Sequence, residues 1–209
     1  MIFIWTYRMR NDCKCISPFR AGVSRFRKVK NLAYIFLLLA NTHVIAQEKF
    51  QIEKSQINFT SNAPLEIIKA ASTELKGAII PATNQFVFQV LIKSFIGFNN
   101  GLQKEHFNEK YMESETYPWA SFTGKIIETV DFTRDGEYDV RAKGDLDIHG
   151  QKQTRIIRCK INIRNGIASV DSDFIVPLAD HNISIPRIVS EKIANQIEVS
   201  IRASMKPKQ

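Results

Sequence analysis

The sequence predicts an all-β protein built around one antiparallel sheet, and three observations lead to this prediction. Apolar and polar residues alternate strictly along 138–148 and 157–164, the pattern of strands with one buried and one wet face. Asp135-Gly136, His149-Gly150 and Asn165-Gly166 lie between the strands, and such dipeptides favour tight hairpin turns. No alternation of strands with long helices indicates a parallel sheet.

The individual elements are placed by the same patterns in chain order. Residues 85–92 are apolar at nearly every position, which is typical of a strand covered on both faces. Helix signals are confined to 103–113, which follows Asn100-Gly101, and to a short turn within 186–195. We expect eight or nine strands, among them 57–60, 85–92, 119–131, 137–148, 154–164, 167–176 and 197–205.

Such a sheet has one apolar face that must be covered, and two architectures do so. The sheet either closes into a barrel or folds into a sandwich, and the alternation fits both. A barrel of about eight strands has an interior just wide enough to be filled by side chains or to hold one ligand. The predicted fold therefore allows two functions, a filled structural barrel or a container for a small molecule.

Residues 1–46 are expected to form a signal peptide that is removed near Ala46. An apolar run at 32–40 follows a basic stretch, and small residues precede Gln47. The run is shorter than the roughly 20 residues that cross a bilayer, so no integral membrane span is predicted. Residues 1–28 lack this pattern, and a start codon at Val29 would give a compact leader. The mature domain is then 47–209, periplasmic or secreted.

Removal of the leader changes the charge of the chain. Residues 1–46 hold eight of the 29 basic residues and one of the 21 acidic residues, which leaves 21 basic and 20 acidic residues. The high isoelectric point therefore belongs to the leader and gives no reason to expect nucleic-acid binding. One cysteine, Cys159, remains after processing, so no internal disulfide is expected.

Motifs for catalysis, metals and cofactors are missing from the sequence. It contains no HExxH, GxSxG, P-loop, dinucleotide or CxxC spacing. His106, His149 and His181 lack short-range ligand spacing, so no metal or cofactor is predicted. An enzyme would need Asp173, Asp180 or His181 as acid–base groups, with pKa values perturbed inside a pocket.

Two further features have a structural and a functional interpretation. Cys159 shares its phase with Ile157 and Ile161, so we expect a buried thiol with a raised pKa in preference to a nucleophile. The stretch 111–124 is rich in aromatic residues, which either rim the mouth of a pocket or plug one end of the core.

Three stretches of the chain resemble the YceI-like family of exported lipid-binding proteins, described as polyisoprenoid binders. They are HFNEKYMESETYPWASFTGKI (106–126), YDVRAKGDLDIHGQKQ (138–153) and IPRIVSEKIANQIEVSI (185–201). The Tyr117-Pro118 strand start and the Gly-x-Leu-x-Ile-His-Gly hairpin at 144–150 are the most specific parts. The resemblance covers most of 48–205 and implies an eight-stranded antiparallel, lipocalin-like barrel with one or two short helices and an elongated apolar tunnel.

We therefore predict that the barrel binds a long apolar molecule, an isoprenoid or fatty-acyl lipid, without catalysis, for transport or storage in the cell envelope. Two alternatives stay open: a filled barrel that acts as a structural or protein-interaction module, and an enzyme that uses the same cavity. The sequence does not indicate the oligomeric state. The predicted ligand-binding residues are the inward-phased Phe86, Phe88, Val90, Phe122, Tyr138, Val140, Leu146, Ile157, Cys159 and Ile161.

Overall fold

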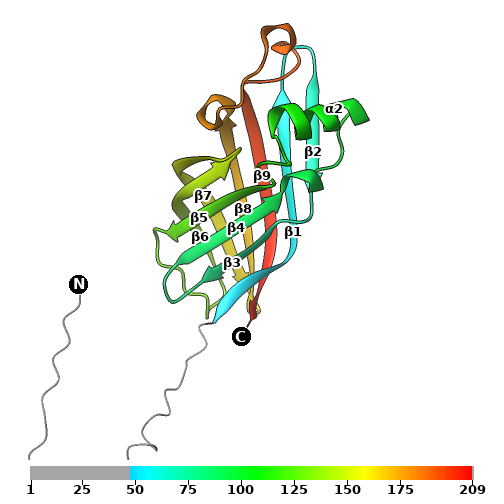
Figure 1. The fold of residues 1–209 in the computed structure, drawn as a ribbon. Coiled ribbons are helices and arrows are strands. Elements are labelled where there is room, and N and C mark those ends of the chain that lie inside the picture. The colour runs from blue at the N-terminus through cyan, green and yellow to red at the C-terminus, as the bar shows by residue number, and fades with distance from the viewer. Residues whose placement is uncertain (1–47, 209) are drawn as a thin grey trace, which may run out of the picture. The chain divides into compact units, whose positions relative to one another are not determined.

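A computed structural model describes residues 48–208, which form an antiparallel β-barrel with one short α-helix (Figure 1). The signal peptide predicted over 1–46 lies outside the described residues. Across 48–208, none of the helices has the length and apolar character needed to cross a membrane. The strands are β1 (Lys49–Asn62), β2 (Ile67–Ser72), β3 (Lys76–Ile80), β4 (Gln85–Leu91), β5 (Trp119–Ile126), β6 (Gly136–Ile148), β7 (Gln151–Arg164), β8 (Ile167–Pro177) and β9 (Gln196–Lys208).

β1 closes the barrel because it pairs with both ends of the sheet. One of its edges pairs with β9 from Lys49↔Lys208 to Thr60↔Glu198. Its other edge pairs with β2 through its C-terminal half and with β3 near its N-terminus. β2 and β3 thus share one position, and the nine segments make a closed barrel of eight positions. The prediction of a barrel is confirmed, and the sandwich is excluded.

Two of the three predicted hairpin turns are present. His149 and Gly150 join β6 to β7 with φ values of 53° and 70°, and Asn165 and Gly166 join β7 to β8 with 52° and 72°. These left-handed conformations are the ones that two-residue hairpins require. The prediction for Asp135-Gly136 was wrong, because Gly136 begins β6 at the end of the loop 127–135.

That loop also corrects the predicted strand 119–131, since β5 ends at Ile126. The carboxylate of Glu128 accepts hydrogen bonds from the backbone N–H and the Nε of Arg141, at 2.6 and 2.7 Å. These bonds hold the pKa of Glu128 below its usual value. The backbone N–H of Ile127 still donates to the carbonyl oxygen of Arg141 at 2.9 Å, but a side chain replaces the backbone acceptor for the N–H of Arg141, and the ladder ends there.

Four further differences separate the predicted elements from the structure. β2 and β3 were not predicted, and the strand expected at 57–60 extends over Lys49–Asn62. The helix expected over 103–113 is α2 (Gly101–His106) followed by a wider, π-type turn over Phe107–Tyr111. β4 is covered on one face only, because Val87 on its outer face is 42% exposed. The helical turn expected within 186–195 is present as the 3-10 turn Arg187–Val189.

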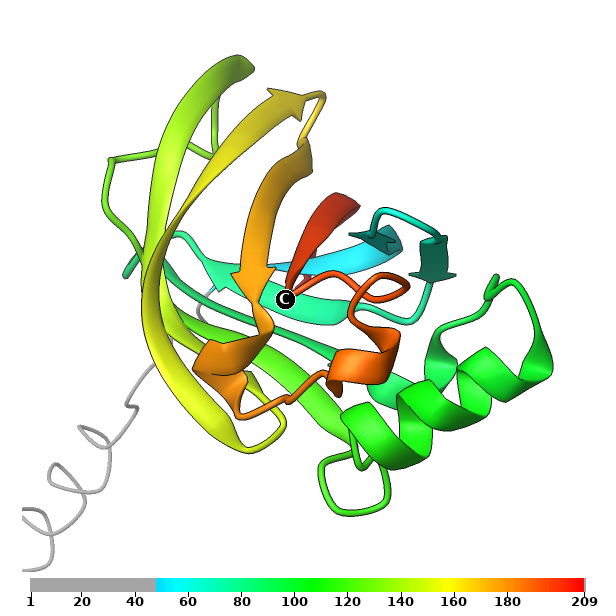
Figure 2. The same ribbon diagram turned by 90° about the horizontal axis from the view of Figure 1, so that it is seen from above.

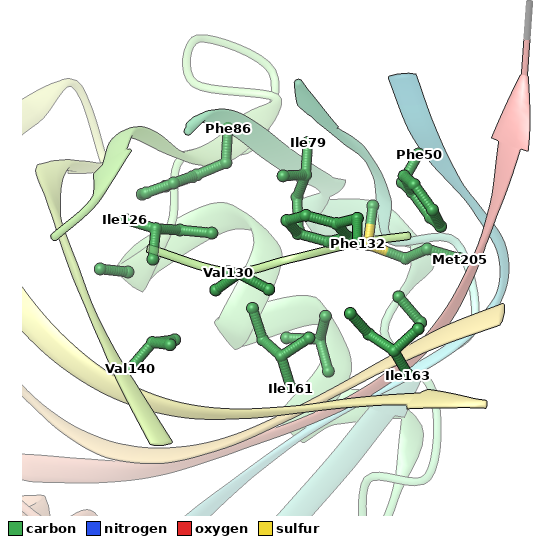
Figure 3. Close-up of a cluster of buried hydrophobic side chains, with 13 residues drawn as sticks. Phe50, Ile79, Phe86, Ile126, Val130, Phe132, Val140, Ile161, Ile163 and Met205 are labelled. Carbon is green, nitrogen blue, oxygen red and sulfur yellow. The ribbon is translucent and has the colours of Figure 1, made fainter. Parts of the chain in front are cut away.

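One end of the barrel is filled by packed side chains (Figure 3). Val130 and Phe132 point into the barrel from the loop 127–135, and the ring of Phe132 lies 5.0 Å from that of Phe50. Ile161, Ile163 and Met205 on the surrounding strands are at most 1% exposed. We call this the closed end, and it holds the dense hydrophobic core of the domain.

The opposite end is covered by short helical elements (Figures 1 and 2). The segment 178–195 lies over it and contains the 3-10 turns Leu178–His181 and Arg187–Val189. α2 lies beside this segment, and Asn100 caps the helix by accepting a hydrogen bond from the backbone N–H of Gln103. We call this the mouth.

We expect Gly144→Ala to lower the free energy of unfolding by about 1–3 kcal/mol, as overpacking does in other proteins. Gly144 pairs directly with Gly124, and a Cβ atom on Gly144 would lie 2.3 Å from the carbonyl oxygen of Thr123. The control is Gly101→Ala, where nothing lies within 4 Å. Urea unfolding should separate the two variants, and equal stabilities would contradict the close approach of β5 and β6.

Candidate functional site

The interior between the closed end and the mouth contains an apolar cavity of about 360 Å³. This volume lies within the roughly 300–1,000 Å³ typical of small-molecule sites. Side chains from every strand position of the barrel contribute to its wall, and the segment 178–195 contributes Ile183, Val189 and Ile193. A barrel packed like a crystal throughout would leave no such space.

Some of the inward side chains around the cavity are less buried than those at the closed end. Phe88, Phe122 and Phe174 have inward phase on their strands, yet each is only partly buried. Val199 and Ile201 on β9 behave in the same way, whereas Met205 further along β9 is fully buried. Apolar side chains that face inward and keep part of their surface uncovered provide contact surface for an apolar ligand.

The structure places nine of the ten predicted ligand-binding residues along the cavity wall. These are Phe86, Phe88, Val90, Phe122, Val140, Leu146, Ile157, Cys159 and Ile161. Tyr138 has the same phase, but it packs at the closed end, and its hydroxyl donates to the carbonyl oxygen of Asp131 at 3.3 Å. Contact of these residues with a ligand remains a prediction.

An aromatic cluster at the mouth was not predicted as part of the site. Phe59, Phe98 and Phe107 line the cavity, and the ring of Phe107 stacks on that of Phe59 at 5.2 Å. Phe98 lies 5.1 Å from Phe107, and Phe95 lies 5.3 Å from Phe59. The segment 95–107 has no strand-like alternation, so its phenylalanines gave no phase from which an inward direction could be inferred.

Polar side chains that line the cavity include a group at the mouth. Glu66, Gln103, His106 and Lys192 belong to the wall and come from the β1–β2 turn, α2 and the segment 178–195. Glu66 accepts hydrogen bonds from the side-chain amides of Gln103 and Asn99. An elongated guest would therefore meet apolar walls along its length and polar groups near one end.

The aromatic stretch 111–124 is divided between two environments. Tyr111 and Phe122 line the cavity, and burial raises the pKa of the Tyr111 hydroxyl. Tyr117 packs edge-on against His149 at 4.8 Å between ring centroids, and Trp119 is 42% exposed. The stretch therefore neither rims the mouth as a unit nor plugs one end of the barrel.

The candidate acid–base groups lie outside the cavity wall. Asp173 is on the outer surface, where a hydrogen bond from Arg202 lowers its pKa. Asp180 is exposed beside Arg155. His181 is fully buried, and its Nδ1 lies 3.0 Å from the carbonyl oxygen of Gln151. Within 48–208, no three His, Cys, Asp or Glu side chains are grouped so as to hold a metal ion.

Cys159 lies in the cavity wall, and its surroundings change the pKa of its thiol. Burial raises the pKa of Cys159, and the nearby hydroxyl of Ser172 partly opposes this effect. A raised pKa leaves less thiolate at any pH below it, and the thiolate is the reactive form.

We expect iodoacetamide to alkylate Cys159 at least about tenfold more slowly than free cysteine at pH 8, in a Cys13→Ser, Cys15→Ser variant. The rate should still rise above about pH 8.5, where the rate for free cysteine levels off. The same variant unfolded in urea serves as the control. If the alkylation rate depended on pH in the same way for the native and the unfolded protein, the thiol would be neither shielded from the reagent nor raised in pKa.

Comparisons with known proteins agree with this geometry. A polyisoprenoid-binding domain from Saccharophagus degradans superposes with a TM-score of 0.62 at 15% identity, over 76% of this chain and 98% of that one. BcnA of Burkholderia cenocepacia superposes with a TM-score of 0.60 at 14% identity, over 72% of this chain and 95% of that one. No curated protein matched the sequence. The YceI-like domain model matches residues 44–205, and the chain therefore belongs to the YceI-like family.

Proposed function

We propose that this protein binds one long apolar molecule, an isoprenoid or a fatty-acyl lipid, inside the barrel. The observation that carries the proposal is the cavity, which is bounded by aliphatic and aromatic side chains that face inward, several of them only partly buried. A barrel with only a structural role would be expected to be packed throughout, without an internal cavity of about 360 Å³. The solved domain from Saccharophagus degradans, described as polyisoprenoid-binding, has the same fold.

The chemistry of the wall favours a guest that is selected by its length. Each methylene removed from water stabilises a complex by roughly 0.8 kcal/mol. The polar groups at the mouth, among them Gln103, His106 and Lys192, suit one hydroxyl or charged end of an otherwise apolar chain. The wall between the mouth and the closed end offers no charged partner to a second polar group.

The protein acts as a carrier or store and not as an enzyme. Catalysis needs an acid, base or nucleophile that reaches the bound molecule. Asp173, Asp180 and His181 lie outside the wall, and the raised pKa of Cys159 disfavours its nucleophilic form. The acid–base groups that do line the cavity, Glu66, His106 and Lys192, are at the mouth, where they suit the polar end of a ligand. With a leader removed near Ala46, the domain would do this work in the periplasm or outside the cell, where it transports or stores lipid of the envelope.

The test is native mass spectrometry of the protein purified from its own cell envelope, followed by extraction into organic solvent. We expect one apolar adduct per chain. Purified protein should also take up tritiated geranylgeraniol, an isoprenoid alcohol, at one molecule per chain. A protein that carries no adduct and takes up neither geranylgeraniol nor palmitate would instead be a filled barrel with a structural or protein-binding role.

A further inference from the structure

The wall of the barrel is not continuous between β7 and β8. The two strands pair from Arg164↔Ile167 at their hairpin to Lys160↔Asp171, and the ladder stops there. Beyond that point β7 remains paired with β6 as far as Gln151, and β8 remains paired with β9 as far as Pro177. Residues 151–159 and 172–177 therefore face each other without backbone hydrogen bonds. We call this stretch the seam.

Side chains close the seam in place of the missing ladder. Ser172 donates its hydroxyl hydrogen to the carbonyl oxygen of Arg158 at 2.9 Å. Further along, Arg155 donates from Nη2 to the carbonyl oxygen of Ile175 at 3.0 Å, and its Nη1 lies 3.6 Å from the carboxylate of Asp180. Gln153 donates to the carbonyl oxygen of Asp180 at 2.8 Å. These contacts involve flexible side chains, so they open at lower cost than a ladder.

Side chains of β7 and β8 lie between the cavity and solvent at the seam. Ile157 and Cys159 on β7, and Phe174 on β8, line the cavity on the inner side. On the outer side, Ile156 and Ile175 are 57% and 48% exposed, one on each strand.

A second hollow lies on the outer surface beside the start of the seam. It shares Val140, Cys159 and Ser172 with the wall of the cavity. The other residues that line this hollow are charged, among them Arg158, Asp171 and Arg202. The outer side of the seam thus combines a charged hollow at its start with the exposed Ile156 and Ile175 further along.

The mouth is held by a main-chain bond of a kind that the seam lacks. The backbone N–H of Leu65 donates to the carbonyl oxygen of Glu191 at 2.8 Å, which ties the β1–β2 turn to the segment 178–195. The backbone N–H of Ala194 donates to the buried hydroxyl of Ser61 at 2.9 Å. Widening the mouth would break a bond between two main-chain groups and a bond to the buried Ser61, whereas separating β7 from β8 would break only bonds that side chains donate.

We propose that the seam is the portal through which the apolar ligand enters and leaves the barrel, with Arg155 and Ser172 as its latch. The proposal rests on the function proposed above and adds the path by which the ligand reaches the cavity. The ligand passes between the strands over Ile156 and Ile175, and the latch re-forms behind it. Binding strength is then set by the cavity, and the rate of exchange is set by the seam.

The test is a cross-link across the seam, made after loading with tritiated geranylgeraniol. The seam variant carries Ile156→Cys and Ile175→Cys, and a flexible bifunctional maleimide joins these two cysteines. The native cysteines are removed by Cys13→Ser, Cys15→Ser and Cys159→Ala. The matched control joins Ile156→Cys to Lys143→Cys, because Lys143 is the β6 partner of Ile156 in an intact ladder. The cross-link across the seam should slow release of geranylgeraniol into phosphatidylcholine vesicles at least about tenfold, because a gating motion then limits release. The control cross-link between β6 and β7 should leave the release rate unchanged.

A second variant tests the latch without a cross-link. Arg155→Met should speed release by about tenfold, because the net strength of one hydrogen bond from a charged group is of this order. Its control is Lys152→Met, an equal loss of charge at an exposed position of the same strand. Unchanged release in both seam variants, with normal loading, would overturn the portal and leave the binding function standing. Failure of the unmodified chain to load geranylgeraniol or palmitate would overturn both.

Discussion

Replacing Phe132 with alanine is expected to lower the free energy of unfolding by about 3–5 kcal/mol, the usual cost of removing a buried phenylalanine. Phe132 is 6% exposed and packs against Phe50 at the closed end, although it belongs to a loop and not to a strand. Its loss would leave a void among strands from both ends of the chain. Total stabilities of single domains are only about 5–15 kcal/mol, so the variant should unfold at far lower urea concentrations.

The control for this prediction is Phe98→Ala at the mouth. Phe98 is only partly buried, so its removal should cost less than the roughly 3 kcal/mol of a fully buried side chain. For uptake of geranylgeraniol, the order of the two effects should be reversed. Phe132 does not line the cavity and its variant should still bind, whereas Phe98 lines it and its variant should bind more weakly. Equal stability losses would contradict the assignment of the core to the closed end.

Replacing Phe88 with glutamate is expected to weaken geranylgeraniol binding by about 100-fold or more, because a carboxylate in an apolar site lacks a partner. Phe88 lines the cavity from β4 and packs against Phe86 at 5.8 Å between ring centroids. Burial would raise the pKa of the new carboxyl group, since the charged form is disfavoured there. Affinity should therefore recover partly as the pH falls and the group becomes neutral.

The matched control is Val87→Glu, one residue earlier on the same strand. Val87 points to the outer face and is 42% exposed, so this variant should bind as the wild type does. Phe88→Gln separates the effect of charge from that of shape, because it should bind better than Phe88→Glu at neutral pH. Circular dichroism checks that each variant is folded. Equal binding by Val87→Glu and Phe88→Glu would place the ligand outside the barrel.

The sequence predicted the strands of the second half of the barrel well, and the reason is physical. β6, β7 and β8 each have one buried and one wet face, so apolar and polar residues alternate along their sequences. β2 and β3 give no such signal, because Ile67 on β2 is 52% exposed and β3 is short. The apparent continuation of β5 to 131 had another cause. Val130 and Phe132 keep the alternation by filling the closed end from a loop.

The direction of the cavity residues was predictable, whereas the position of the empty space was not. Phase along a strand shows that Tyr138 and Val140 both point inward. It does not show that Tyr138 lies past the cavity, beside Gly136 and the loop 127–135. The mouth depends on Phe59, Phe98 and Phe107, which meet only because the barrel brings 59 close to 95–107. Such contacts between distant segments are set by tertiary packing.

The pairing of β1 with β9 has a consequence for how the chain reaches its final state. Lys49 is bonded to the strand that ends at Lys208, so the first strand has no partner on that edge until the last one is present. Contacts between residues so far apart in sequence make folding slow, because a long loop must close before they form. A chain still emerging from a ribosome would therefore keep an open sheet, and the barrel would close only after β9 has been synthesised.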